Sequence, residues 1–546
     1  MRTFLQICVV VCAGFLNAIA LAQTKPSLPE SSPLPIRGWW TMDQHAIKDL
    51  DRAGEFGINL LIIEHHSEDV WNEVIHYLAM YDFSDKYRKS GADREKTEHY
   101  LAHYREITAA ARHHGVPCYI QTSEPYVPKA LAPVDFDNPE LWSVVNERLR
   151  EVFRALPDLT GVTVYLTEGQ TEVEKLPGSE QSKARRARKV IDTMWAACRA
   201  ENRKFMVGTF IHSKAMLDAV AETLRSFPPD PDFAVLQYCC PNDWGLYEIF
   251  NPSIGRVGPH PEILGFDYNS ENWGQSTHPF IQVDFLARRL REARARSSNI
   301  VGVAGWTAWY GHRTLIGTLN EANVYAGAAL AASPDRDPGD ILREWCAKRF
   351  GEPAAPTAAS CLARTFPVVF KAQHVFGYWV DTSNKSGLPS LWEMDKYFIA
   401  DIFGEALGKW DPAYKPTWEK IQSPDDAFLQ EVLKEKDGAI ALARQNLAEL
   451  RAARDKFKPD DFKTLEQALT FQELWARIWR EQMHAFFLRQ IGRRQGWTDE
   501  RKAQFKEVLT TLSQLADEFE SAFGKAWFPH GPQRIRELIR DLQNEM

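Results

Sequence analysis

Eight short apolar segments occupy the first three-fifths of the chain, and their regular spacing constrains the fold more than any other feature. Each segment has the length of a strand, is rich in β-branched and aromatic residues, and is separated from the next by room for a helix. The segments are 36–42, 58–63, 116–121, 161–166, 205–210, 233–238, 263–268 and 300–305. Eight consecutive β/α units predict an α/β fold, a (β/α)8 TIM barrel, over residues 36–335.

Beyond about residue 335 the strand-like segments stop and long amphipathic patterns begin. Apolar residues recur there at intervals of three and four, with charged residues between them. Helix-start sequences such as Ser423-Pro424-Asp425-Asp426 precede these patterns. We therefore expect an α-helical C-terminal domain (336–546) packed on the barrel, with long helices over 426–456, 461–493, 499–523 and 532–544.

The N-terminus has the pattern of an export signal. Arg2 supplies a positive charge, residues 5–16 an apolar stretch, and Ala20-Leu21-Ala22 a small-residue cleavage site. We expect a signal peptide (1–22), cut after Ala22, then a linker (23–35) rich in Pro and Ser, with the mature protein periplasmic or secreted. No later segment reaches the about 20 apolar residues that cross a membrane, so no membrane anchor is expected.

Composition narrows the range of partners. The formal net charge is −8, without a dense Lys/Arg block, which argues against nucleic acid. The 18 Trp and 16 Tyr suit a protein that binds an oligosaccharide or polysaccharide, because aromatic rings stack on sugars. The cysteines lack metal-type spacing, so we expect no metal, no cofactor and mostly free, buried thiols, with Cys346–Cys361 the first disulfide to test. The oligomeric state stays open.

Three acidic residues come just after predicted strands. Glu168 follows the fourth segment, Asp243 the sixth and Glu271 the seventh. In a barrel these positions meet at the C-terminal rim, where active sites form. Hydrolysis of a glycosidic bond needs two carboxyl functions, one to protonate the leaving oxygen and one to activate water or attack carbon. One acid alone is as easily a helix cap or a rim ion pair, but three together favour a glycosidase site.

Other residues near the strand ends are candidates for sugar contacts, through hydroxyl hydrogen bonds or ring stacking. A structural alternative exists for each: Asp43 can cap the next helix, Glu124 precedes Pro125 in a turn, and the tryptophans can be rim packing. His65 and His66 point to opposite faces of an extended chain, which argues against a two-histidine metal site. The candidates are Asp43, Glu64, His65, Glu124, Gln170, His212, Trp244, Trp273, Trp306 and Trp309.

The segments around the three acids resemble glycoside hydrolase family 67, whose α-glucuronidases remove 4-O-methyl-glucuronic acid from xylan fragments. Thr167-Glu168-Gly169-Gln170 is similar to the sequence around the family's catalytic acid. Pro241-Asn242-Asp243-Trp244 resembles the segment of its catalytic aspartate, and Glu271-Asn272-Trp273-Gly274-Gln275 that of its second base candidate. The resemblance covers about residues 36–352. It implies an inverting reaction with Glu168 as general acid, and with Asp243 and Glu271 handling the attacking water, the choice of base between them staying open.

Two departures from the family bear on the substrate. The family's N-terminal β-sandwich is not expected, since the first predicted strand follows the linker. The positions of the family's basic residues that bind the uronate carboxylate hold Val164, Tyr238 and, approximately, Gly208. An anionic sugar binds poorly without a cation, so we expect a largely neutral wall with at most one basic residue. Candidate replacements are Lys214, Arg256 and Arg313.

The sequence therefore predicts an exported, exo-acting, inverting α-glycosidase, α-glucuronidase-like, that removes sugar side chains from a polysaccharide. Two alternatives stay open. One is a carbohydrate-binding or degenerate barrel without turnover. The other is a hexosaminidase-type glycosidase that uses the acetamido group of its substrate, although such sites usually have adjacent acids after the fourth strand, where this chain has Thr167-Glu168.

Overall fold

The computed structural model describes residues 33–65, 72–241, 249–308, 314–380, 388–401, 407–527 and 531–545. Eight parallel strands close into a barrel in the order of the chain, which confirms the predicted architecture. Two of them, β1 and β6, have the predicted bounds. The strands are β1 Ile36–Met42, β2 Leu60–Glu64, β3 Cys118–Ser123, β4 Gly161–Tyr165, β5 Lys204–Gly208, β6 Phe233–Tyr238, β7 Glu262–Asp267 and β8 Ile300–Trp306.

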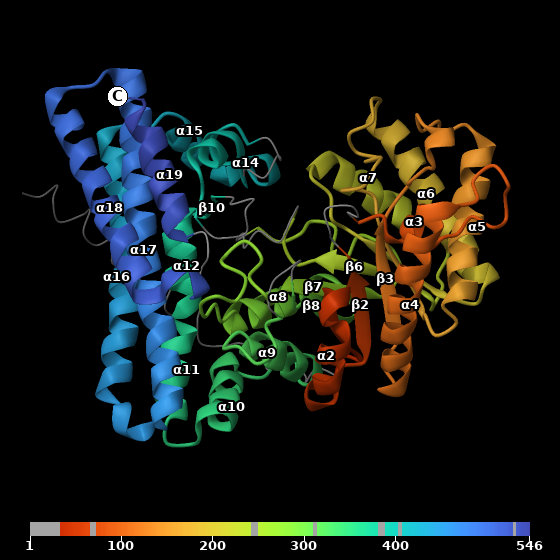
Figure 1. Cartoon of the computed structure of the whole chain (residues 1–546), viewed down its shortest axis with the longest axis horizontal. Helices are drawn as coiled ribbons and strands as arrows, with labels where there is room; N and C mark the ends of the chain where they lie inside the picture. The colour runs from red at the N-terminus through yellow and green to blue at the C-terminus, as the bar shows by residue number, and fades with distance from the viewer. Residues whose placement is uncertain are drawn as a thin grey trace, which may run out of the picture.

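Helices cover the outside of the barrel (Figure 1). Serine and asparagine side chains begin several of them: Asn138 accepts the N–H of Glu140, and Ser213 accepts that of Met216. In the connection from β6 to β7, the described residues 239–241 and 249–261 contain no helix. The outer helices are α2 Asp43–Ala53, α3 Val74–Leu78, α4 Gly91–His113, α5 Pro139–Ala155, α6 Glu180–Ala200, α7 Lys214–Arg225, α8 Val283–Arg296 and α9 Glu321–Ala332.

The inside of the barrel is filled by a separate apolar cluster. Alternate strand residues point inward, and near the C-terminal ends of the strands this cluster is aromatic. Trp40 lies in the middle, with its ring centroid 5.0 Å from Trp306 and 5.8 Å from both Tyr165 and Tyr238. Phe210 stacks on Tyr238. This aromatic layer closes the barrel, so a substrate pocket has to lie above it, at the rim.

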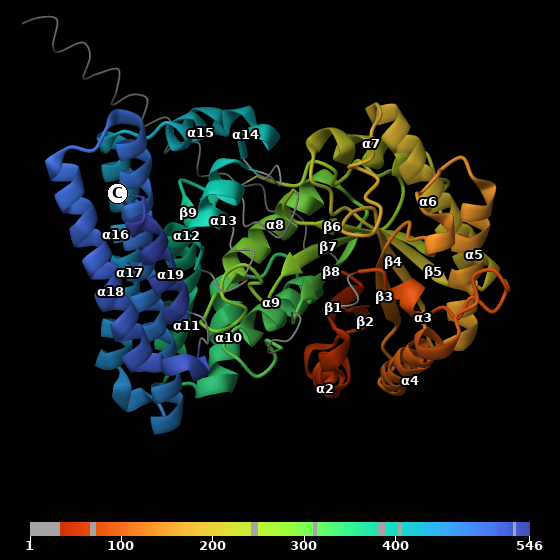
Figure 2. The ribbon, with the colours of Figure 1, turned by 45° about the horizontal axis from the view of Figure 1, so that its top comes forward.

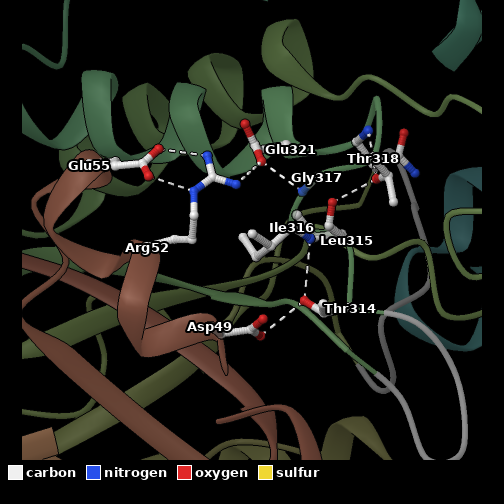
Figure 3. A network of polar contacts seen from close by, with 10 residues as sticks. Asp49, Arg52, Glu55, Thr314, Leu315, Ile316, Gly317, Thr318 and Glu321 are labelled. Carbon is white, nitrogen blue, oxygen red and sulfur yellow. Dashed lines mark hydrogen bonds and ion pairs between the residues drawn. The ribbon is translucent and has the colours of Figure 1, made fainter. Parts of the chain in front are cut away.

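Polar contacts join the first and last β/α units where the barrel closes (Figure 3). Arg52 at the end of α2 forms ion pairs with Glu55 at 2.6 Å and with Glu321 at the start of α9 at 3.1 Å. Asp49 accepts a hydrogen bond of 2.9 Å from the hydroxyl of Thr314. Burial raises the pKa of Asp49 to about 7. The closure therefore contains a carboxyl group that is easily protonated.

Long helices beside the barrel make up most of the C-terminal region, as Figures 1 and 2 show. The four long helices expected from the sequence are present, with ends that differ by a few residues, which confirms the helical region. Gly524 has non-helical angles within α18. The domain boundary at residue 336 stays a prediction. The main helices are α10 Pro338–Phe350, α11 Ala355–Ala363, α12 Thr365–Gln373, α16 Asp426–Ala452, α17 Pro459–Gln495, α18 Asp499–Trp527 and α19 Gly531–Gln543.

Short elements connect α12 to α16. They include a two-stranded hairpin, one helix with π-type hydrogen bonds and three short α-helices. The hairpin follows α12 directly and lies against the barrel side of this region. The elements are β9 His374–Val375, β10 Tyr378–Trp379, α13 Leu391–Glu393, η3 Met394–Ile399, α14 Leu407–Trp410 and α15 Lys415–Gln422.

All six cysteines of the described residues are buried, and none of them forms a disulfide bond, Cys346 and Cys361 included. Among the helices that the structure describes, none is both long enough and apolar enough to cross a membrane. The predicted signal peptide and nearly all of the linker lie outside the described residues, so they stay predictions.

Candidate active site

Glu168 lies in the turn after β4, at the C-terminal rim. Its φ of 51° is a left-handed conformation that non-glycine residues seldom adopt, and such strain is commonly found at functional sites. The next residue is Gly169, where an added Cβ would lie 2.9 Å from the Cβ of Ser123, so glycine lets the turn approach β3. Asn72 Nδ2 donates a 3.3 Å hydrogen bond to Glu168 Oε2. The half-buried carboxylate is thus held between the loops that follow β2 and β4.

Glu271 lies in the loop after β7 and is only 3% exposed. Its backbone N–H donates a 2.7 Å hydrogen bond to Asp267 Oδ2, at the last position of β7. Ser270 has a φ of 57° and its carbonyl accepts the N–H of Gln275 at 3.0 Å, so the chain turns tightly around Glu271. Both acids that the structure describes therefore sit in constrained turns at the same end of the barrel.

The helical region holds this β7 loop from the other side. Gln373, at the end of α12, donates a 2.9 Å hydrogen bond to the carbonyl of Asn272. The ring of Trp273 lies parallel to His374, with an interplanar angle of 6°, and 5.8 Å from Trp379. Trp273 is 0% exposed. It is therefore a packing residue, and our prediction that it forms a sugar-stacking wall is corrected.

Gln472 and His278 extend the same contact. Gln472 on α17 donates a 2.9 Å hydrogen bond to the carbonyl of Pro279, and the ring of His278 lies against Phe471 and Trp475 of the same helix. The helical region is therefore part of the structure that positions Glu271.

Glu64 and Trp40 form a polar contact inside the barrel. Glu64 is the last residue of β2, and strand alternation places it on the inward side with Leu60 and Ile62. The indole N–H of Trp40 donates a 2.9 Å hydrogen bond to Glu64 Oε2. A carboxylate thus sits on the aromatic layer, at the end of the barrel where the sugar is expected to lie.

Asp43 and His65 form a second acid–base pair on the rim. Asp43 Oδ2 lies 2.7 Å from His65 Nδ1 and 3.5 Å from His103 Nε2. Burial raises the pKa of Asp43, but hydrogen bonds from His103 and His65 outweigh it and lower the pKa to about 2. The other ring nitrogen of His65 is buried and has no hydrogen-bond partner among the described residues. Asp43 therefore orients His65 and leaves one nitrogen for a ligand.

Three other predicted contacts have different surroundings. Glu124 is buried in an ion pair with Arg148 and also accepts the N–H of Tyr126, so it is structural, and our prediction of a sugar contact is corrected. Trp306 is 1% exposed within the aromatic layer, so it supports the floor and does not form a wall. Gln170 is exposed, and its side-chain oxygen accepts the N–H of Val127.

His212 follows β5 and is half-buried. Its backbone N–H donates to Glu174 Oε2 at 2.9 Å, and its ring lies 4.8 Å from Phe210 of the aromatic layer. It lines a cavity of about 550 Å³ together with Lys409 and Trp410 of α14. Asp243, Trp244 and Trp309 lie outside the described residues.

The structure describes the three positions that correspond to the basic residues of family 67. The side chain of Val164 points outward from β4, into the core between the strands and the outer helices. The hydroxyl of Tyr238 lies inside the barrel, 3.2 Å from that of Tyr165. At Gly208 an added Cβ would be 1.6 Å from Cε1 of Tyr165, so no side chain fits.

Of the candidate replacement bases, Lys214 lines the cavity beside His212. Lys214 and Arg256 both form ion pairs with Asp218 on the outer helix α7, and Arg313 lies outside the described part. Among the residues that the structure describes, no three His, Cys, Asp or Glu side chains form a cluster that could bind a metal ion.

Asp267 and Asn72 are not among the residues predicted for the site. The predicted strand extends to residue 268 and so includes Asp267, whereas the observed strand ends at Asp267. Strand alternation was the available signal, because Ile263 points into the barrel and residues 265 and 267 share its face. Asn72 carried no signal, since its loop lies far from Glu168 in the sequence.

Comparison with known proteins supports the fold. No family model and no curated protein matches the sequence. A solved GH138 enzyme targeting pectin rhamnogalacturonan II matches 91% of this chain and 63% of its own, with a TM-score of 0.59 and 14% identity. The chain thus spans less than two-thirds of that enzyme. At this identity the similarity establishes a glycoside hydrolase-like barrel fold, and membership of family 67 stays a prediction.

Two further solved structures match with lower TM-scores. A GH115 4-O-methyl-α-glucuronidase with specificity for decorated arabinogalactans has a TM-score of 0.47 at 10% identity, over 93% of this chain and 62% of its own. An O-GlcNAc hydrolase of Thermobaculum terrenum has a TM-score of 0.45 at 11% identity, over 93% and 94%.

Proposed function

We propose that the protein is an exported, inverting, exo-acting α-glycosidase that removes sugar side chains from a polysaccharide or its oligosaccharides. The observation that carries the proposal is Glu168, held in a strained turn at the barrel rim by Asn72. A carboxyl group at this position can reach the glycosidic oxygen of a sugar that lies on the aromatic layer.

The reaction assigns a role to each acid. Glu168 donates a proton to the leaving oxygen, and Glu271 or Asp243 deprotonates the water that attacks from the opposite face of the sugar. An inverting site requires roughly 6.5–9.5 Å between the acid and the base. Asp267 and the helical region support this role for Glu271, because they fix the loop from two sides.

The inner wall favours a neutral sugar at the cleaved position. In the resemblance to family 67, the uronate contacts correspond to Val164, Tyr238 and, approximately, Gly208, none of which is a cation. Glu64 and His65 supply hydrogen-bonding groups of the kind that recognise sugar hydroxyls. The proposal therefore keeps from the α-glucuronidases the inverting cleavage of an α-glycosidic bond, with a neutral sugar in place of the uronate as the released group.

A screen of glycosides tests the proposal. The mature protein is incubated with aryl α- and β-glycosides of neutral sugars, uronates and N-acetylhexosamines, and NMR follows the anomer released. We expect turnover of an α-glycoside of a neutral sugar with release of the β-anomer. Release of the α-anomer contradicts the inverting mechanism, turnover of N-acetylhexosaminides alone supports a hexosaminidase, and sugar binding without any turnover supports a non-catalytic barrel.

A matched pair of variants tests the assignment of the acid. Glu168→Gln is expected to lower kcat by about 10²–10⁴-fold, the usual contribution of a general acid. Glu222→Gln on the exposed face of α7 removes the same charge away from the rim and is expected to be as active as the wild type. Equal activity of both variants contradicts the assignment. Export is tested by expression of the full chain, with an N-terminus at Gln23 as the expected product.

A further inference from the structure

A cavity of about 700 Å³ lies on the outside of the barrel, between the loop that precedes α5 and the helix α6. Phe136 and Trp142 form its aromatic wall, and Arg185, Arg186 and Lys189 of α6 form its basic wall. None of the residues predicted for the active site lines it. The cavity therefore needs an explanation of its own.

The three cations of the basic wall form no ion pairs with the described residues. In the described residues, none of Arg185, Arg186 and Lys189 has an ion-pair partner, although most other arginines of the barrel helices do. Nη1 of Arg186 is buried and has no hydrogen-bond partner there either. A buried donor without an acceptor is costly, so an anionic ligand that reaches Arg186 would recover that free energy.

The aromatic wall keeps two of these cations in place. The guanidinium of Arg186 lies 5.7 Å from the ring centroid of Phe136, and Lys189 Nζ lies 5.6 Å from that of Trp142. Asp135 and Asp137 also line the cavity, but both are exposed, and Asp135 Oδ1 accepts the N–H of Asp137 within their own loop. Cations beside flat rings form a combination that suits an acidic sugar, whose ring stacks while its anionic group is paired.

A second cavity lies beside this site, toward the rim. It has a volume of about 460 Å³ and shares Val134 and Leu176 with the first. Its other lining residues include Gly169 and Gln170, directly after Glu168. The two cavities are therefore neighbours, and the second one reaches the residues next to the candidate acid.

We propose that the cavity at α6 is a binding site for an anionic stretch of the polysaccharide, carrying sugar carboxylates or sulfate esters, outside the pocket of the cleaved sugar. The proposal rests on the proposed function, because the neighbouring cavity is lined by Gly169 and Gln170, directly after Glu168. It separates the two kinds of recognition: the neutral wall inside the barrel takes the sugar that is released, and the cations of α6 take the charge of the chain that carries it.

Calorimetric titration tests the proposal with the mature full-length protein. The probes are tetragalacturonate as the carboxylate, a sulfated galactan oligosaccharide as the sulfate ester, and xylotetraose as the neutral control. We expect at least one anionic probe to bind, with an affinity that falls as salt is raised, and xylotetraose to bind more weakly by at least about tenfold. Equal binding of all three probes, or no binding of either anionic probe, would overturn the proposal.

Variants assign the binding to α6. Arg186→Gln combined with Lys189→Gln is expected to weaken anionic binding by at least about tenfold. Arg185→Gln combined with Lys189→Gln changes only exposed side chains, so it provides a second measurement if the first pair lowers stability. Arg188→Gln is the matched control, because Arg188 lies on the same helix but pairs with Asp192 and with Ser226. Unchanged affinity in both double variants contradicts the proposal.

This titration is independent of turnover. If no glycoside is hydrolysed but the anionic probe still binds through α6, the proposed hydrolase function fails and the binding site stands. If glycosides are hydrolysed but the double variants bind as the wild type does, the hydrolase stands and the α6 site fails.

Discussion

Asp267 accepts the backbone N–H of Glu271 at 2.7 Å, so the last residue of β7 fixes the start of the loop that carries the second candidate acid. The acceptor is a side chain of the rigid barrel, and the donor is the backbone of the residue to be positioned. The helical region contacts the next two residues of the same loop through Gln373 and His374. Glu271 is therefore supported by both parts of the chain.

Replacement of Asp267 tests its positioning role. Asp267→Ala removes the acceptor and is expected to lower kcat by about 10–10²-fold with a smaller effect on KM, because displacement of a catalytic group slows the chemical step. Asp267→Asn keeps an oxygen that can accept the same N–H, and it is expected to retain most of the activity. Steady-state kinetics compares the two variants, and equal impairment of both contradicts a positioning role.

The contribution of the helical region can be measured at Gln373. Gln373→Leu leaves the buried carbonyls of Asn272 and Val380 without this donor, which is expected to cost about 1–3 kcal/mol of stability. It is also expected to lower kcat, because the loop of Glu271 loses an anchor. Gln490→Leu is the control, since Gln490 contacts Asp395 within the helical region. A loss of stability with unchanged kcat indicates that the helical region does not position Glu271.

Asp49 predicts a pH dependence of stability. Burial raises its pKa from 3.8 to about 7, so between these pH values the folded protein retains a proton that the unfolded chain releases. This group therefore makes stability fall as the pH rises from about 4 to about 7, and the deficit persists at higher pH. Asp49→Asn removes the ionisable group and is expected to be more stable than the wild type at pH 8 by about 2–4 kcal/mol, with little difference at pH 4.

Thermal unfolding at the two pH values measures the effect, with the exposed Asp51→Asn as control. The result that contradicts the account is a variant less stable than the wild type at pH 8. It would mean that Asp49 is ionised and paired within the contacts with Thr41 and Thr314.

His65 is expected to contribute to binding of the sugar substrate. Its Nε2 has no hydrogen-bond partner among the described residues and can contact a sugar hydroxyl, so His65→Ala should raise KM by about tenfold with a smaller change in kcat. His99→Ala, an exposed residue on α4, is the matched control. A change in kcat alone would assign His65 to catalysis and contradict a binding role.

The barrel could be predicted because each of its strands appears in the sequence as a short continuous segment. A strand buried on both faces reads as a short apolar run, and β1 and β6 begin and end where the runs do. The second run began two residues too early, because the N–H of Ile58 bonds to the carbonyl of Ala53 and so completes the turn after α2. The pattern of apolar residues in the sequence does not show such a backbone turn.

The errors at the site involve partners that are distant in the sequence. Trp273 reads as a rim aromatic until His374 and Trp379 are found on its faces, about a hundred residues further along. Glu124 reads as a rim acid until Arg148 reaches it from the middle of α5. A sequence motif places a residue after a strand, but contacts with distant parts of the chain decide whether its side chain is used in packing or in an internal ion pair.

The most direct test of the central claim compares leaving groups in Glu168→Gln. A general acid is needed when the departing oxygen is basic and is dispensable when it is not. The account predicts that the variant loses about 10²–10⁴-fold in kcat/KM on a phenyl glycoside but retains nearly full activity on the 2,4-dinitrophenyl glycoside. An equal loss on both substrates, or no loss on either, would contradict the assignment of Glu168 as the proton donor.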